Sequence, residues 1–196
     1  MYRVRRRSEG TEFHDFSEVG PPPDEHATAG RMNPPGISYF YMALEPETAL
    51  AETLDKPPCH AAVAKFETTK DLLVLDLTEL PPLPSVFDAQ RSDERQGLLF
   101  LERFVAAISA PVARDGREHV DYIPSQVVCE FFAQVMTLDG NSHLDGIEYP
   151  SAVRRGGKNV VLFPPRDIGK RWEERISLKD ISHVSFHTWE ELKKAI

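Results

Sequence analysis

The chain has 196 residues, of which 41% are hydrophobic and 28% are charged, as is typical of one folded domain with a substantial core. No run of 18 apolar residues occurs, and the basic start of the chain lacks the apolar stretch of a secretory signal, so neither a membrane span nor export is predicted. The net charge of −8 disfavours binding to DNA and to anionic membranes.

In the first part of the chain, the pattern of apolar and turn-forming residues predicts short strands and one helix. We expect a strand over residues 1–7, a polar loop over 8–30, a turn rich in glycine and proline over 30–36, and a strand over 39–43. A helix is expected from Pro46, which suits a first helical turn, to a point before Pro57.

The remainder of the chain is predicted to mix strands with two longer helices. Strands are expected at 61–67 and 72–76, helices around Leu98–Ile108 and Val127–Met136, and strands at 146–151 and 159–163. Thr188 and Glu191 fit the capping box of a final helix. We therefore predict one mixed α/β domain over residues 1–196, and the strand so close to Met1 leaves open an upstream domain in a longer protein.

Several common catalytic motifs are missing. The sequence has no Walker A loop, no GxGxxG, no HExxH, no CxxC and no GxSxG, so neither a bound metal nor a tightly bound cofactor is expected. The two cysteines, Cys59 and Cys129, fit a reducing cytoplasm better than a disulfide scaffold, and Cys129 is expected in the core.

Basic residues gather near both ends of this acidic chain. Such clusters either are solvated patches or attract one small anionic ligand, and the sequence leaves both interpretations open. The first cluster holds Arg3, Arg5, Arg6 and Arg7, and the second holds Arg154, Arg155, Lys158, Arg166, Lys170, Arg171 and Arg175.

Three segments carry polar residues that a packed core would not need. Arg31 lies on a loop shaped by glycine and proline, where its guanidinium is either solvated or presented to a phosphate or ribose. Ser151 ends a strand before the basic turn Arg154–Asn159, whose glycines allow close approach of an anion or simply form a hairpin.

The third segment is the predicted helix after Pro46, which carries two glutamates. Glu47 lies in the first turn, where a negative charge favours the helix dipole. Glu52 lies beside the apolar face, and a partly buried carboxylate there must be paired or functional. We therefore expect Glu52 rather than Glu47 to be the catalytic acid, although a solvent-facing Glu52 remains the alternative.

Taken in order, these segments resemble the RES domain family, named for an arginine, a glutamate and a serine. Four stretches carry the resemblance: YRVRR, GRMNPPGISYFYMALEPETALAET, DYIPSQVVCEFF and DGIEYPSAVRRGGKNVVLF. One residue departs from the family pattern, because Met32 follows the loop arginine where members usually have an aromatic side chain.

The resemblance implies a fold similar to that of ADP-ribosyltransferase toxins and a reaction on NAD. It places the catalytic triad at Arg31, Glu52 and Ser151, and further substrate contacts at Arg3, Tyr41 and Asn159. It also implies a bacterial toxin inhibited by a separate antitoxin protein, which would be the DNA-binding partner. A homodimer is left open.

The nicotinamide of NAD is a cationic leaving group, so cleavage of its bond to ribose needs no general acid. Glu52 would stabilise the oxocarbenium-like ribose, and Arg31 and Arg3 would hold phosphates or hydroxyls. Ser151 would orient the ribose or Glu52. Tyr41 would stack on the nicotinamide or adenine ring. Water, phosphate or a protein side chain would be the acceptor. The alternative from another class is a non-catalytic module that binds a nucleotide or RNA through its basic clusters.

Overall fold

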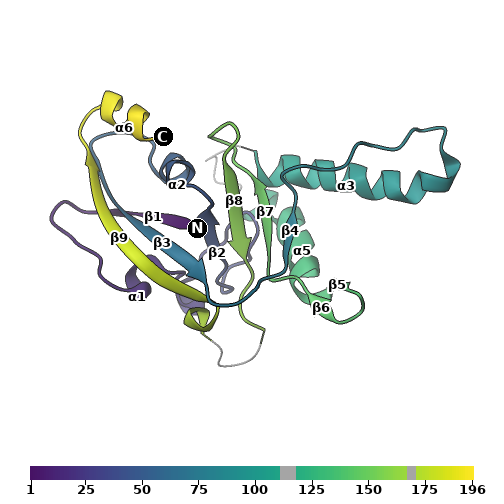
Figure 1. Cartoon of the computed structure of the whole chain (residues 1–196), viewed down its shortest axis with the longest axis horizontal. Coiled ribbons are helices and arrows are strands. Elements are labelled where there is room, and N and C mark those ends of the chain that lie inside the picture. Colours follow the sequence, from purple (N-terminus) through teal and green to yellow (C-terminus); the bar gives the residue numbers. More distant parts are fainter. Residues whose placement is uncertain (111–117, 167–170) are drawn as a thin grey trace.

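A seven-stranded sheet forms the centre of the structure, which is a computed structural model that describes residues 1–110, 118–166 and 171–196 (Figure 1). Across the sheet the strands are β4 (Val74–Asp76), β7 (Gly146–Pro150), β8 (Lys158–Leu162), β2 (Phe40–Ala43), β1 (Tyr2–Arg7), β3 (Cys59–Thr68) and β9 (Ile176–Phe186). Only β4 and β7 pair in parallel, so the predicted central mixed sheet of a single α/β domain is confirmed.

The sheet is joined weakly at its middle. β1 pairs with β3 over six residue positions, from Tyr2 opposite Lys65 to Arg7 opposite His60, but with β2 only where Tyr2 lies opposite Ala43. The two strands then separate, and α2 (Pro46–Thr53), which follows β2, packs against β1 beside the opening. The sheet therefore consists of two parts, β4–β7–β8–β2 and β1–β3–β9.

The helices lie at the edges and faces of these parts. Figure 1 shows α3 (Ser92–Ile108) extending from the sheet on the side of β4 and β7, while β9 forms the opposite edge. The others are α1 (Phe16–Val19), α4 (Glu118–Asp121), α5 (Ile123–Glu130) and α6 (Trp189–Ala195). No helix among the described residues is long and apolar enough to cross a membrane.

Residues that alternate along β3 face two different cores, because successive side chains of a strand point to opposite faces. Ala61 and Val63 pack with α2 and α6, whereas Ala62, Ala64 and Phe66 pack with the aromatic residues around α1. A third core lies under α3 and α5 and contains Cys129, which is fully buried as predicted.

Most predicted elements are confirmed, including the capping box of Thr188 and Glu191 that begins α6. Other elements differ from the prediction. The loop at 8–30 contains α1 and a 3-10 turn, η1 (Asp24–His26), and the helix after Ile123 ends as a π-helical segment, η3 (Phe131–Val135). The sequence pattern did not predict most of β9 or the hairpin of β5 (Thr137–Leu138) and β6 (Ser142–His143). β9 is an edge strand, and several of its residues are polar and exposed, so its sequence lacks a clear alternation of apolar residues.

A buried arginine ties the ends of several strands together. The Arg175 guanidinium, whose side chain is 6% exposed, donates from Nη2 to Asp145 Oδ1 at 2.7 Å and from Nη1 to the Phe163 carbonyl at 2.9 Å. Asp145 Oδ2 accepts from the Leu73 amide at 2.8 Å. Burial lowers the pKa of Arg175, and the nearby Asp145 opposes that shift.

Asp145→Ala should therefore destabilise the protein by about 2–3 kcal/mol, because it leaves a buried guanidinium without its carboxylate. The measurement is the free energy of unfolding in urea. Glu94→Ala, which breaks the exposed Arg91–Glu94 pair on α3, is the matched control and should leave the unfolding midpoint unchanged. Equal midpoints for both variants would contradict the structural role given to Asp145.

Candidate functional site

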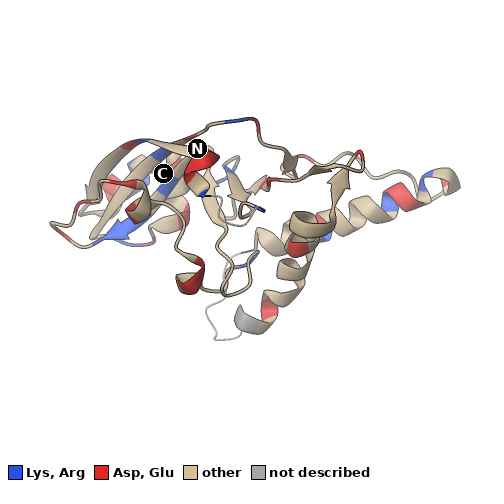
Figure 2. Cartoon of the chain, turned by 90° about the horizontal axis from the view of Figure 1, so that it is seen from below, with Lys and Arg blue, Asp and Glu red and all other residues tan. Residues whose placement is uncertain are grey.

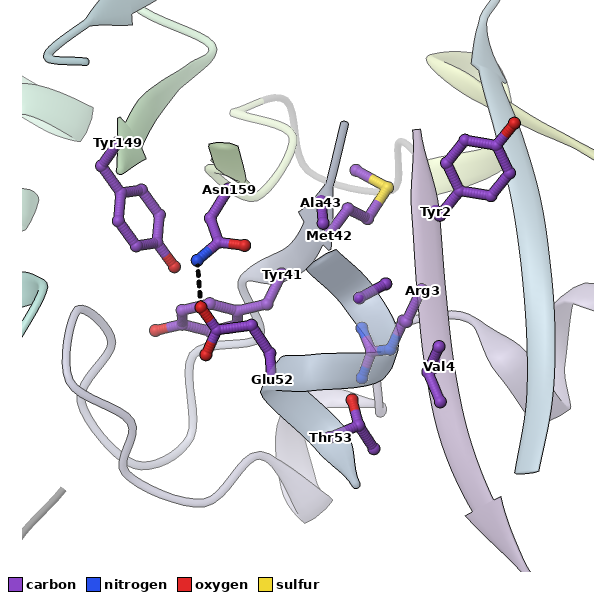
Figure 3. A pocket seen from close by; sticks show the side chains of 11 residues that line it. Tyr2, Arg3, Val4, Tyr41, Met42, Ala43, Glu52, Thr53, Tyr149 and Asn159 are labelled. Atoms are coloured by element: carbon purple, nitrogen blue, oxygen red, sulfur yellow. Dashed lines mark hydrogen bonds between the residues drawn. The ribbon is translucent and has the colours of Figure 1, made fainter. Parts of the chain in front are cut away.

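A cleft opens where β1 and β2 separate, and it consists of two adjoining pockets. One pocket of about 280 Å³ lies on the side of β1 and contains Arg3. The other, of about 310 Å³, lies on the side of Arg31 and the end of α3. Both are lined by the same four residues, which therefore form the centre of the cleft: Tyr41, Glu52, Tyr149 and Asn159 (Figure 3).

The carboxylate of Glu52 lies in this centre and is held by two donors. Its Oε1 accepts from Ser151 Oγ at 2.7 Å and from Asn159 Nδ2 at 2.6 Å. Its Oε2 makes no hydrogen bond to the part of the chain that the structure describes. Of the two alternatives for this side chain, the solvent-facing one is confirmed, because Glu52 lies in the last turn of α2 and is exposed.

The turn after β7 fixes the direction in which Ser151 donates. The Ser151 hydroxyl oxygen accepts from the amides of Val153 at 3.2 Å and Arg154 at 3.1 Å, so its proton is left for Glu52. The turn is closed by the Ser151 amide, which donates to the Gly157 carbonyl at 2.8 Å. Ser151 therefore donates to Glu52, and its role in a reaction stays a prediction.

The loop that carries Arg31 is held by polar side chains from outside the loop. Tyr41 donates to Asn33 Oδ1 at 2.8 Å and accepts from the Met32 amide at 3.2 Å. From α5, Gln126 donates to the carbonyls of Gly30 at 2.7 Å and Asn33 at 3.0 Å. Sequence reasoning missed Asn33 and Gln126, and the signal for Gln126 was a polar residue inside an apolar helix pattern.

Arg31 itself is directed toward the end of α3. Its Nη1 donates to the Ala107 carbonyl at 2.7 Å, and its guanidinium lies 5.3 Å from the centre of the Tyr122 ring. It lines the larger pocket together with Met32 and Ile108. The side chain is thus fixed at one end of the cleft, while nitrogens other than Nη1 make no hydrogen bond to the described part of the chain.

Arg3 occupies the opposite end of the cleft. Its guanidinium lies 5.3 Å from the centre of the Phe40 ring, and its Nη1 is buried without a hydrogen-bond partner among the described residues. Burial, with a smaller effect of Arg5, lowers the pKa of Arg3 to about 10, so the group stays charged at neutral pH. A buried cation without a partner is costly, and an anionic ligand in this pocket would offset that cost.

The remaining arginines of the first basic cluster bind the chain itself. Arg5 donates to the Glu18 carbonyl at 2.9 Å, Arg6 donates to the Thr53 carbonyl at 2.7 Å, and Arg7 donates to the Thr11 carbonyl at 2.8 Å. Arg154, expected on a free turn, donates to Thr48 Oγ1 at 3.3 Å. Figure 2 shows basic and acidic residues interspersed along the chain.

The second basic cluster is divided in the same way. Arg155 is exposed, Arg175 is paired inside the fold, and Arg166 donates to the Ala133 carbonyl. Lys170 lies outside the described residues. Within the described ranges, no three His, Cys, Asp or Glu side chains come together as a set of metal ligands.

A comparison with protein families gives one finding. The model of the RES domain family matches residues 1–179 of the 196-residue chain, a range that includes both pockets and all six residues predicted for the site. A search of curated proteins finds no match.

The contact between the serine turn and α2 can be tested at Gly157. A Cβ at this position would lie 2.6 Å from Oγ1 and 3.0 Å from Cγ2 of the fully buried Thr48. Gly157→Ala should therefore destabilise the protein by about 1–3 kcal/mol. Gly97→Ala, in α3 with open space around it, is the control and should stabilise by about 0.5–1 kcal/mol. Urea unfolding measures both, and a stable Gly157→Ala would show that the turn is not clamped on α2.

Proposed function

Because the chain belongs to the RES domain family, whose members are associated with the use of NAD, we propose that it breaks the bond between nicotinamide and ribose in NAD. One observation carries this proposal: a carboxylate oriented by two donors lies between two pockets, and each pocket has its own arginine. NAD is an elongated dianionic pyrophosphate with a cationic ring at one end, so its two halves suit adjoining pockets.

In the proposed reaction the C–N glycosidic bond breaks and its electron pair moves to the nicotinamide nitrogen, which becomes neutral. Positive charge develops on the ribose, and the exposed Oε2 of Glu52 would stabilise it. Ser151 and Asn159 hold the carboxylate in place before the reaction, so little reorganisation is needed when the charge develops. An acceptor oxygen then bonds to the ribose carbon and releases its proton to solvent.

The two arginines would bind the charged and hydroxyl groups of NAD. Arg3, which has a buried unpartnered nitrogen, lines the smaller pocket, and Arg31, held by Ala107, lines the larger one. Guanidinium groups suit phosphate and vicinal hydroxyls because their planar donors can bond two oxygens at once. The ring of Tyr41, with its hydroxyl bound to Asn33, would contact a ring of the substrate. No metal or additional cofactor is part of the proposal.

The acceptor gives the reaction its name. We propose water or phosphate, which would make the enzyme a glycohydrolase or a phosphorylase that depletes NAD, since the exposed Glu52 leaves the cleft open to small acceptors. ADP-ribosyl transfer to a protein is the alternative within the same site. A likeness of the fold to ADP-ribosyltransferase toxins remains part of this proposal.

A non-catalytic module for RNA or nucleotides is supported less well. A surface that binds phosphates has no use for a carboxylate at its centre, which would repel them. Arg5, Arg6 and Arg7, which such a surface would need, donate instead to backbone carbonyls. The central carboxylate of Glu52 and the contacts of these three arginines therefore favour the enzyme.

We also propose that an antitoxin protein inhibits the enzyme, because unrestrained consumption of NAD would poison the cell that makes it. The link of RES domains with toxin–antitoxin systems supports such a partner. The negative net charge argues against direct contact with DNA, and we place the reaction in the cytoplasm.

Glu52→Gln should lower the turnover of NAD by about 10²–10³-fold, the usual loss when one group that stabilises transition-state charge is removed. NAD binding should persist, because that charge acts mainly in the transition state. Glu47→Gln, exposed in the first turn of α2, is the control and should stay near wild type. Fluorescence of etheno-NAD measures the rate. If Glu47→Gln loses more turnover than Glu52→Gln, the assignment of Glu52 as the catalytic acid is wrong.

Arg31→Lys should be nearly as damaging to kcat/KM as Arg31→Ala, because lysine keeps the charge but loses the planar set of donors. Arg155→Lys, on the exposed turn, should behave like wild type. Initial rates against NAD concentration separate the variants. Full activity of Arg31→Lys together with a loss in Arg155→Lys would place anion binding at the glycine turn instead.

A further inference from the structure

Tyr149 lies at the centre of the cleft but has no assigned task. It is on β7, two residues before Ser151, and it lines both pockets. Figure 3 shows its hydroxyl pointing toward the carboxylate of Glu52 and the amide of Asn159. The residue is only 8% exposed and its ring belongs to the core under α3 and α5, so β7 and that core fix the position of the hydroxyl.

The side chains of the other three residues at this centre each make hydrogen bonds within the described structure. The Tyr41 hydroxyl is bound to Asn33 and Met32, and Ser151 and Asn159 both donate to Glu52. The Tyr149 hydroxyl, by contrast, makes no hydrogen bond to any residue that the structure describes. The ring is buried, but the hydroxyl oxygen is not among the buried unpartnered atoms, so it opens onto the cleft, where it is free to bond a ligand.

The environment also keeps this hydroxyl protonated. Burial raises the pKa of Tyr149 well above its usual value, and the nearby Tyr41 and Glu52 raise it further. The group is therefore protonated at neutral pH and can donate a hydrogen bond. It can pair with an oxygen of a ligand but cannot act as a base.

We propose that the Tyr149 hydroxyl donates a hydrogen bond to an oxygen of the substrate's ribose at the junction of the two pockets. This inference rests on the proposed function, which places the reacting ribose beside Glu52. The carboxylate then faces the developing charge, while the hydroxyl fixes the orientation of the sugar. Tyr149 is thus a substrate-binding residue in addition to the six predicted from the sequence.

The test is Tyr149→Phe, which keeps the ring and removes only the hydroxyl. We expect kcat/KM for NAD to fall about 10–100-fold, the range for losing one hydrogen bond to the reacting group. The melting temperature should stay unchanged or rise, because the hydroxyl has no partner to lose within the described structure. In a Glu52→Gln background, in which turnover is expected to be about 10²–10³-fold slower, NAD should bind more weakly once Tyr149→Phe is added.

Tyr39→Phe is the matched control. The Tyr39 hydroxyl donates to Glu130 Oε1 at 2.6 Å in the core, outside both pockets. Its removal should lower the melting temperature by about 2–4 °C and leave kcat/KM within about twofold of wild type.

Two results would overturn the inference while NAD cleavage stands: unchanged kcat/KM in Tyr149→Phe, or a loss of activity that merely follows a lower melting temperature. A different result tests the proposed function itself. If the wild-type protein neither consumes nor binds NAD, the proposed function fails and the role of Tyr149 fails with it.

Discussion

The separation of β1 from β2 is the feature on which the rest of the cleft depends. The two strands share one register position, Tyr2 with Ala43, whereas β1 continues beside β3 for its whole length. A continuous sheet would pair Arg3 with β2 and leave no space between the two parts. Because the strands separate, Arg3 faces a pocket, and α2 brings Glu52 to the mouth of the opening.

The opening has negative charge at its centre and positive charge at each end. One carboxylate, Glu52, lies in the centre, and Arg3 and Arg31 lie in separate pockets on either side. Such an arrangement suits a ligand that carries negative charge away from its reacting atoms and develops positive charge at them. The remaining arginines of β1 donate hydrogen bonds to backbone carbonyls, and Arg6 also pairs with Asp55, so they contribute little to this pattern.

Rigidity of the cleft comes from polar side chains that join its walls. Gln126 and Tyr41 hold the loop of Arg31, and Ser151 and Asn159 hold Glu52. These contacts lie between elements that are far apart in the chain, so the geometry of the cleft is fixed only when the whole sheet has formed. Groups fixed in this way need little rearrangement when a ligand binds.

The sequence by itself determined the local elements and the order of the polar segments. Pro46 marked the start of α2, and Thr188 and Glu191 marked the start of α6. Alternation of residues marked β1 and an apolar run marked β8, because these signals depend on neighbours within a few residues. The resemblance added Arg31, Glu52 and Ser151 as one set.

Tertiary structure alone decided that Ser151 and Asn159 bind the same oxygen of Glu52, from 99 and 107 residues away. It also decided that Glu52 is exposed, that Arg3 differs from its neighbouring arginines, and that Tyr149 faces the cleft. The physical reason is that strand register and the separation of β1 from β2 set these positions, and neither is encoded in a local pattern of residues.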